Sequence, residues 1–253
     1  MLVHLKVRAA ARMVAVVCLV ALIASGAGGA VAQSQPPVRL AALSPAQETL
    51  PFVQLPSPVE PFGIAASQHD RVYQSMRAKW RDLQPVIRIE AQMLDLCRAS
   101  PLFCSAASKQ FLAIVEAARD RYGRARVGEI NRAINLAIRP VSDLAKFNAT
   151  DVWTSPLTTF AAGTGDCEDY AIAKYVALRA AGMDAADLRI VIVRNKFLNQ
   201  DHAVTAARVD GRWLILDNRY MTLLTDSQVR NITPLVSIDG DGAAGATQVA
   251  EAT

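Results

Sequence analysis

The chain has 253 residues, of which 52% are hydrophobic and 20% charged, a composition that excludes a chain disordered throughout. The formal net charge is +4, and three positive charges with no acidic residue lie in residues 1–32, so removing that segment from the +4 leaves +1. A balance this close to neutral, with no stripe of Lys and Arg interleaved with aromatic residues, argues against a nucleic-acid-binding protein.

Residues 1–32 have the features of a secretory signal peptide. Basic residues precede an apolar run from Met13 to Ile23, and small residues follow it and end in Ala30-Val31-Ala32. The alternative is a membrane anchor, but the run is too short to span a bilayer comfortably. We therefore expect an exported protein that is cleaved after Ala32, begins at Gln33, and is not stably inserted in the membrane after cleavage.

Residues 33–67 show neither a helical nor a strand period. They hold seven prolines: Pro36, Pro37, Pro45, Pro51, Pro56, Pro58 and Pro61. This composition predicts an exposed and largely disordered linker. The linker would place the protein away from a membrane surface, and a merely tolerated tail is an equally good interpretation. Residues 241–253, rich in Gly and Ala, are expected to form a flexible tail, which leaves residues 68–240 for the globular domain.

Apolar residues at helical spacing predict the first helices of that domain. From His69 the pattern recurs every three or four residues, Pro85 interrupts it, and the segment from Ile87 to Cys97 resumes it. Further helices are predicted at 108–122 and 127–138, and Pro140 ends the second of these. On the last helix, Asn131 and Asn135 are interpreted as a polar helix face.

Cys97 and Cys104 flank a short turn that contains Pro101. In an exported chain, two cysteines this close predict a local disulfide, and the alternative is two buried thiols. A zinc pair is disfavoured because no second pair of Cys or His follows. With Cys18 lost in the signal peptide, Cys167 is then the odd cysteine, and an odd cysteine in an exported chain suggests a reactive thiol.

Cys167 itself lies where a turn gives way to a helix. Turn formers precede it from Gly163, and helix-favouring residues continue to Ala181 before Gly182. At a helix start the free N–H groups and the helix dipole favour a thiolate, which is the nucleophilic form of cysteine. The alternative is a small buried hydrophobe. Trp153, just upstream, is either a wall of the cleft or a core residue.

Strands follow Gly182. The apolar run 188–193 is one strand, and 203–209 and 212–216 form a hairpin around Asp210-Gly211. The hairpin brings His202, at the start of one strand, near Asp217, at the end of the other. A Cys at a helix start, followed by a His and an Asp on adjoining strands, is the arrangement of nucleophile, base and orienting residue.

The three stretches that carry these residues are 165–175 (GDCEDYAIAKY), 199–204 (NQDHAV) and 214–218 (LILDN). They resemble the bacterial transglutaminase-like cysteine peptidase family of the LapG type, and the resemblance covers residues 68–239. It implies an α+β fold with a papain-like, transglutaminase-like core, in which N-terminal helices and a small antiparallel sheet pack on the nucleophile helix. It also implies a Cys167, His202 and Asp217 triad.

The resemblance further implies a periplasmic, calcium-dependent protease. Its protein substrate would be a large surface adhesin, cleaved near the N-terminus of that adhesin, so that the enzyme affects attachment and biofilm formation. An inner-membrane receptor would be its regulatory partner.

Three acidic residues, Asp166, Glu168 and Asp169, flank Cys167, and nearby carboxylates raise the pKa of a thiol. Either they point away or a cation neutralises them. Carboxylates suit Ca²⁺, although the stretch is no EF-hand and its spacing alone does not name calcium. The resemblance implies that the flanking acids bind calcium, Asp166 and Glu168 foremost and Asp169 with them. The Cys167 backbone N–H is expected to serve the oxyanion hole.

Three functions follow from these observations. The first is a cysteine endopeptidase acting on an exported protein, and the second is a protein-glutamine acyltransferase of the same fold, which would share the triad. The third is a non-catalytic binding module. The three intact residues Cys167, His202 and Asp217 argue against the third, because a binding module has no need for all of them.

Overall fold

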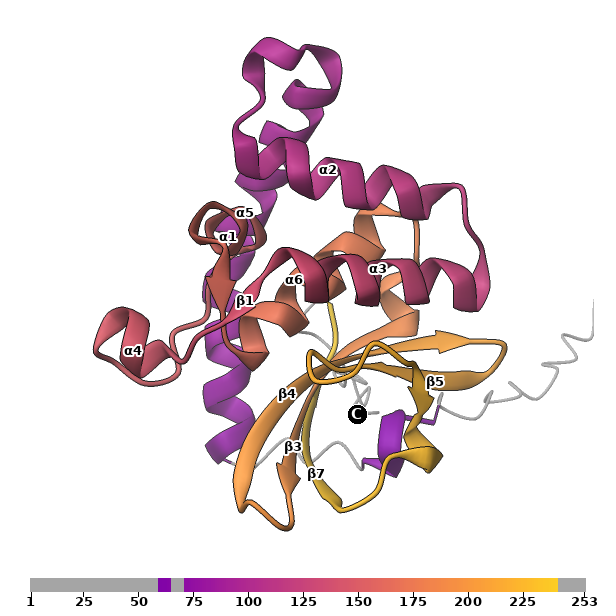
Figure 1. The fold of residues 1–253 in the computed structure, drawn as a ribbon. Helices are drawn as coiled ribbons and strands as arrows, with labels where there is room; N and C mark the ends of the chain where they lie inside the picture. Colours follow the sequence, from indigo (N-terminus) through magenta and orange to yellow (C-terminus); the bar gives the residue numbers. More distant parts are fainter. Residues whose placement is uncertain (1–58, 65–70, 241–253) are drawn as a thin grey trace, which may run out of the picture. The chain divides into compact units, whose positions relative to one another are not determined.

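The computed structural model describes residues 59–64 and 71–240 (Figure 1). The predicted signal peptide, most of the predicted linker and the predicted tail lie outside these residues. Contacts divide the chain into Met1–Gln54 and Leu55–Thr253, and every described residue belongs to the second unit. Within the described ranges, no helix combines the length and apolar character needed to cross a bilayer.

Helices fill the first part of the described chain. Short 3₁₀ turns accompany six α-helices: α1 (Arg71–Ala99), α2 (Ala106–Arg119), α3 (Gly123–Ala137), α4 (Asp143–Phe147), α5 (Pro156–Ala162) and α6 (Cys167–Ala180). The helices predicted at 108–122 and 127–138 correspond to α2 and α3. The predicted helix after the turn at Gly163 corresponds to α6, and Gly182 follows it with a positive φ of 95°.

The predicted interruption at Pro85 was wrong, because α1 runs through this residue without a break. A proline inside a helix removes one backbone hydrogen bond and costs about 3 kcal/mol. Trp80 and Leu94, on either side of it, are buried, and Leu83 and Ile87 pack against the same core. Helices in proteins owe most of their stability to such an apolar face, so packing outweighs the local cost.

A disulfide joins Cys97, near the end of α1, to Cys104, just before α2, as the spacing predicted. Between them lies a 3₁₀ turn, Pro101–Phe103, in which the Ser100 hydroxyl accepts a hydrogen bond from the Leu102 backbone N–H. The bond therefore fixes the sharp change of direction between the two helices.

The second part of the chain forms a five-stranded antiparallel sheet with strand order β6-β5-β4-β3-β7. Its strands are β3 (Leu188–Asn195), β4 (Gln200–Val209), β5 (Arg212–Leu216), β6 (Leu224–Thr225) and β7 (Ile232–Ile238). The predicted hairpin is the pair β4 and β5, and Asp210 and Gly211 form its turn with φ values of 50° and 74°. The sequence did not predict β6 and β7.

Alternate residues of the sheet face two separate apolar clusters. One face packs against α6, which in turn contacts α3, and Figure 1 shows both helices on the same side of the strands. The other face carries a smaller cluster, where Phe62 and Ile64 pack on the strands together with Val229 and Ile232. The helices and sheet thus confirm the expected α+β class, with the sheet packed on the helix that begins at Cys167.

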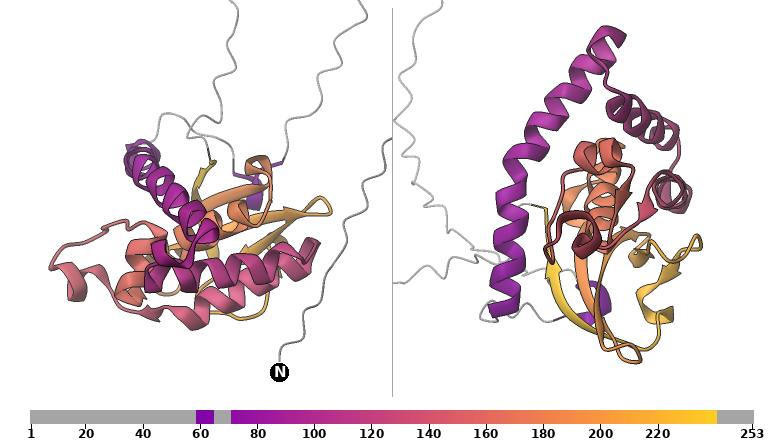
Figure 2. Two further views of the ribbon diagram at one scale, coloured as in Figure 1. Left: turned by 90° about the horizontal axis from the view of Figure 1, so that it is seen from above. Right: turned by 60° about the vertical axis from the view of Figure 1, so that its left-hand side comes forward.

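Residues 59–64 belong to the predicted linker, yet in the structure they lie against the sheet. Glu60 accepts two hydrogen bonds from the Arg189 guanidinium, both at 2.8 Å, and the indole N–H of Trp213 donates to the Val59 carbonyl at 2.8 Å. Figure 2 shows this segment beside the strands, with α1 running along the domain. Residues 59–64 of the predicted linker therefore pack against the domain.

Candidate active site

Cys167 is the first residue of α6, where the free backbone N–H groups of a helix start are found. The preceding Gly163–Gly165 turn is fixed from two sides. Thr164 and Gly165 form a short parallel pair with Arg139 and Pro140, and a Cβ on Gly165 would lie 2.7 Å from the Cβ of Asp169. Only glycine fits so close to the helix, so Gly165 allows the turn to lead directly into α6 at Cys167.

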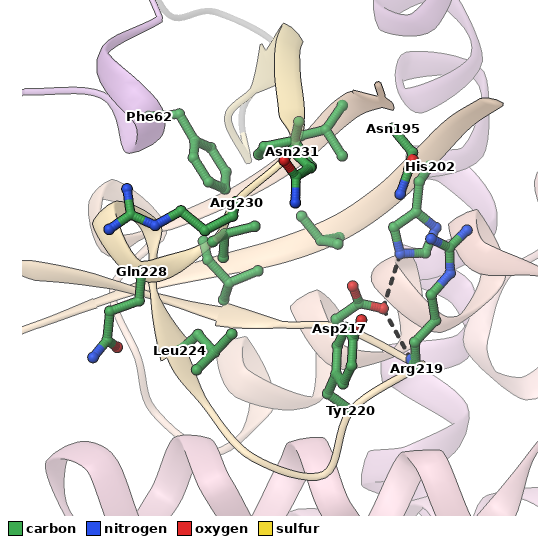
Figure 3. A pocket seen from close by; sticks show the side chains of 15 residues that line it. Phe62, Asn195, His202, Asp217, Arg219, Tyr220, Leu224, Gln228, Arg230 and Asn231 are labelled. Atoms are coloured by element: carbon green, nitrogen blue, oxygen red, sulfur yellow. Dashed lines mark hydrogen bonds and ion pairs between the residues drawn. The ribbon is translucent and has the colours of Figure 1, made fainter. Parts of the chain in front are cut away.

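His202 and Asp217 meet at one end of the β4–β5 hairpin. Thr205 lies opposite Leu216 in the ladder, so the ladder stops just short of both residues. The His202 Nε2 lies 2.8 Å from Asp217 Oδ1, and the Arg219 backbone N–H also donates to that oxygen at 2.9 Å. Figure 3 shows the two side chains pointing at each other. The predicted proximity of these residues across the hairpin is therefore present.

This pairing leaves the other ring nitrogen of His202 available. Burial would raise the pKa of Asp217, but the hydrogen bond and charge of His202 and the Arg219 N–H hold it below its usual value. An ionised Asp217 accepts a hydrogen bond from Nε2–H, and that bond favours the tautomer in which Nδ1 carries no proton. Among the described residues Nδ1 has no hydrogen-bond partner, and the ring is only 4% exposed.

Cys167 and His202 line one cavity of about 350 Å³. Trp153, Asp151, Asp166 and Glu168 also line it, with Met76, Ile192, Asp201 and Ala203. The indole N–H of Trp153 donates to Asp151 at 2.9 Å, which holds the ring at the cavity wall. Of the two interpretations of Trp153, the wall of the cleft therefore holds, although the ring also packs against the core.

The Cys167 thiol donates a hydrogen bond to Glu168 Oε2 at 3.2 Å, and among the described contacts it has none with His202. Burial raises the pKa of Cys167 and the charge of Glu168 raises it further, while the backbone N–H of Ala203 opposes the rise. In this arrangement the thiol keeps its proton. The conflict foreseen from the sequence, between the flanking acids and a thiolate, is thus present in the structure.

Glu168 also belongs to a group of three carboxylates that we call the acidic trio: Asp143, Asp166 and Glu168. One oxygen from each lies within 4.8 Å of the others, and Asp143 and Glu168 are buried. Asp143 was not predicted. It is the first residue of the five-residue α4, far from Cys167 in sequence, and nothing local distinguishes it from an ordinary helix-start acid.

The carboxylates of the acidic trio lack hydrogen-bond donors for some of their buried oxygens. Oδ1 of Asp143 and Oδ1 of Asp166 are both buried with no hydrogen-bond partner among the described residues. Asp166 is the N-cap residue of α6, yet its side chain makes no cap hydrogen bond. Burial, together with Glu168 and Asp143, raises the pKa of Asp166 to about 9. Buried carboxylate oxygens without donors are the ligands that hard divalent cations take, so this donor set fits such an ion.

Asp169, the third predicted metal ligand, lies apart from the acidic trio. It is fully buried, and its Oδ1 accepts hydrogen bonds from the backbone N–H and the hydroxyl of Thr154 at 2.9 and 2.6 Å. Its Oδ2 lies 3.8 Å from the Lys146 ammonium. Asp169 is therefore not a member of the acidic trio, although its Oδ2 is buried and has no hydrogen-bond partner among the described residues.

Asn131 and Asn135 do not form the polar helix face that the sequence suggested. Asn131 is fully buried, and its amide donates to the carbonyls of Tyr220 and Met221 at 3.0 and 3.3 Å. The Asn135 amide donates to the Asp217 carbonyl at 3.0 Å. Both residues thus anchor the loop after β5 to α3, and with it the backbone of Asp217.

Comparison with known proteins gives one family and several solved structures. Residues 84–230 match the family described as bacterial transglutaminase-like cysteine proteinase, BTLCP. Legionella pneumophila LapG matches with 25% identity over 58% of this chain and 82% of its own, with a TM-score of 0.49, and a calcium-bound LapG structure matches with the same values. A crystal structure of a TGase covers 45% of this chain at 16% identity and a TM-score of 0.35. No curated protein matches the sequence.

Proposed function

Because the chain belongs to the bacterial transglutaminase-like cysteine proteinase family and is a cysteine peptidase, we propose that Cys167, His202 and Asp217 are its catalytic residues. The observation that carries the proposal is the 2.8 Å pair between His202 and Asp217, beside a cavity that His202 shares with Cys167. A protein substrate follows from the peptidase activity.

In the proposed reaction, His202 Nδ1 takes the proton of the Cys167 thiol, and the sulfur attacks the carbonyl carbon of the scissile peptide bond. The oxyanion that forms accepts a hydrogen bond from the Cys167 backbone N–H at the start of α6. The imidazolium then gives its proton to the leaving amine, and water hydrolyses the thioester. Throughout, Asp217 holds Nε2–H and so keeps the ring in position.

The roles of the three residues are tested by digesting a peptide library and sequencing the new N-termini by mass spectrometry. Cys167→Ala and His202→Ala should each abolish cleavage, since members of a triad act as a unit, and Asp217→Asn should leave a small residual rate. Asp201→Asn is the matched control, because Asp201 lines the same cavity but pairs with Arg194. Cleavage by Cys167→Ala at the wild-type rate would exclude this mechanism. Incorporation of an added amine into peptides, in place of cleavage, would indicate the acyltransferase.

The acidic trio supports a second proposal, that the enzyme binds Ca²⁺ through Asp143, Asp166 and Glu168. Two of its buried carboxylate oxygens have no donor, and two of its members, Glu168 and Asp166, raise the pKa of the Cys167 thiol. A bound calcium ion would supply positive charge beside Cys167. The Cys167 thiol donates a hydrogen bond to Glu168, and a Glu168 carboxylate engaged by the ion would leave the thiol proton to His202.

Calcium binding is measured by calorimetry and by the melting temperature of the chelator-treated protein. Calcium should raise the melting temperature, because a ligand that binds only the native state stabilises it. Calcium should also restore activity better than magnesium, which demands stricter geometry. Asp143→Asn should lose both effects, while Asp201→Asn should keep them. A chelated enzyme with full activity, and a melting curve unmoved by calcium, would show that the trio is only a helix start with buried acids.

We further propose a periplasmic enzyme that cleaves a large surface adhesin, under the control of an inner-membrane receptor. The support is the signal-like segment 1–32 and the resemblance of the three site stretches to LapG-type proteases. N-terminal sequencing of the exported protein should find Gln33 first. Deleting the gene should leave more of one large protein on the cell surface and strengthen attachment. Complementation with wild type, but not with Cys167→Ala, should reverse both changes, and equal reversal by Cys167→Ala would remove the adhesin proposal.

A further inference from the structure

A second cavity, of about 340 Å³, lies against the face of the sheet that carries the smaller apolar cluster. Its floor is apolar, because the buried side chains of Val193, Val204 and Ile215 line it, and Phe62 adds a further apolar wall. Figure 3 shows the side chains around this cavity. An apolar floor with a few polar groups at its edge is the usual character of a ligand-binding pocket.

The second cavity adjoins the candidate active site at the catalytic pair. His202 and Asp217 line it, and His202 also lines the cavity of about 350 Å³ that contains Cys167. The imidazole ring is therefore a wall that the two cavities share. Figure 3 shows the pair at one edge of the side chains that surround the second cavity. A peptide that runs past His202 from the first cavity would therefore reach the second.

The proposed reaction decides which part of the substrate lies on the His202 side. The imidazolium gives its proton to the leaving amine, which is the first atom of the chain that follows the cleaved bond. That amine must come within about 3 Å of the ring, while the carbonyl carbon lies at the Cys167 sulfur. The residues that follow the cleaved bond are thus led past His202 toward the second cavity.

The rim of the second cavity is positively charged. The exposed side chains of Arg219 and Arg230 line it, and neither guanidinium lies within 4.0 Å of a carboxylate of the described residues. Asp217 is the one acidic residue of the lining, and its Oδ1 already accepts hydrogen bonds from His202 and from the Arg219 backbone N–H. The rim is therefore complementary to a carboxylate that a ligand would bring.

We propose that the second cavity binds an acidic side chain, glutamate foremost, from the substrate segment that follows the cleaved bond. The inference rests on the proposed peptidase reaction. Glutamate has an apolar stem that suits the floor and a carboxylate that suits the arginines at the rim. Ion pairs of exposed side chains contribute little, so the preference for glutamate over glutamine should be about twofold to fivefold. It should weaken as added salt screens the charges.

Sequencing the new N-termini of a digested peptide library reads this segment directly, because each new N-terminus begins with the residue after the cleaved bond. The wild type should enrich glutamate at one fixed position. Two synthetic peptides that differ only by Glu or Gln at that position then give the ratio of their kcat/KM values. This ratio should fall toward one at high salt.

Arg230 is the arginine to replace, because the backbone and the charge of Arg219 both act on Asp217. Arg230→Gln should remove much of the preference for glutamate, and Arg230→Glu should turn it toward lysine at the same position. Arg212→Glu is the matched control. Arg212 is also exposed, but it lies at the other end of β5 and lines a separate cavity, so this variant should keep the wild-type kcat/KM and preference.

The outcomes separate the cavity from the peptidase. Cleavage that depends on Cys167 but shows no acidic preference after the cleaved bond would overturn the inference and leave the peptidase standing. A preference for glutamate that is unchanged in folded Arg230→Gln and Arg230→Glu would overturn it too, because the rim would then not read the charge. Absence of cleavage that depends on Cys167 would remove the peptidase and, with it, the inference.

Discussion

At the scale of single residues, the side chain of Glu168 stands between two partners. One of its oxygens accepts a hydrogen bond from the Cys167 thiol at 3.2 Å, and the same side chain belongs to the acidic trio with Asp143 and Asp166. The first contact stabilises the thiol form of Cys167, and crowding by three acids raises the energy of every ionised member. Whatever engages Glu168 therefore also decides how readily the nucleophile loses its proton.

The effect of Glu168 on the thiol can be measured by pH titration. Burial and then Glu168 raise the pKa of Cys167, so Glu168→Gln removes the second cause and should lower that pKa in the calcium-free protein. The thiolate should accordingly form at lower pH than in the wild type. Its ultraviolet absorbance measures how much thiolate is present at each pH. Asp201→Asn should leave the titration unchanged. A higher pKa in Glu168→Gln would show that the carboxylate favours the thiolate.

At the scale of secondary-structure elements, the sequence predicted those parts of the site that depend on residues close together in the chain. The Asp210-Gly211 turn predicted the β4–β5 hairpin, and the turn before Cys167 predicted the start of α6. Both predictions succeeded because turn type and hydrophobic periodicity depend on residues that are neighbours in the chain. Strand β7 contains Pro234 and lacks a regular alternation of apolar and polar residues, so the sequence pattern did not predict it. Asp143 joins the acidic trio only through tertiary contacts between α4 and the start of α6, which no sequence window contains.

The disulfide between the ends of α1 and α2 is the element whose removal is simplest to predict. Replacing Cys97 and Cys104 with Ala should lower the free energy of unfolding by about 2–3 kcal/mol, since the bond closes a short loop in the unfolded chain. Denaturant unfolding measures this loss, and activity in the folded variant should persist because the bond lies outside the candidate site. If the exported, unreduced protein titrates with thiols at both positions, the bond is not formed in the cell.

At the scale of the whole described domain, the candidate catalytic residues come from three elements that meet at one end of the sheet. Cys167 begins α6, His202 lies near the start of β4, and Asp217 follows β5. Their alignment depends on the apolar cluster between α6 and the strands, which is the larger of the two that enclose the sheet. Substitutions that loosen this packing should therefore impair catalysis before they unfold the protein.

The most direct test of this account is the rate at which iodoacetamide alkylates Cys167 near neutral pH with saturating calcium. Only a thiolate reacts appreciably, so the rate reports whether His202, held by Asp217, activates the sulfur. We predict that His202→Ala slows alkylation about tenfold or more, that Asp217→Asn slows it less, and that Asp201→Asn matches the wild type. Equal alkylation rates in the wild type and in folded His202→Ala would contradict the account, because His202 would then have no effect on the formation of the Cys167 thiolate.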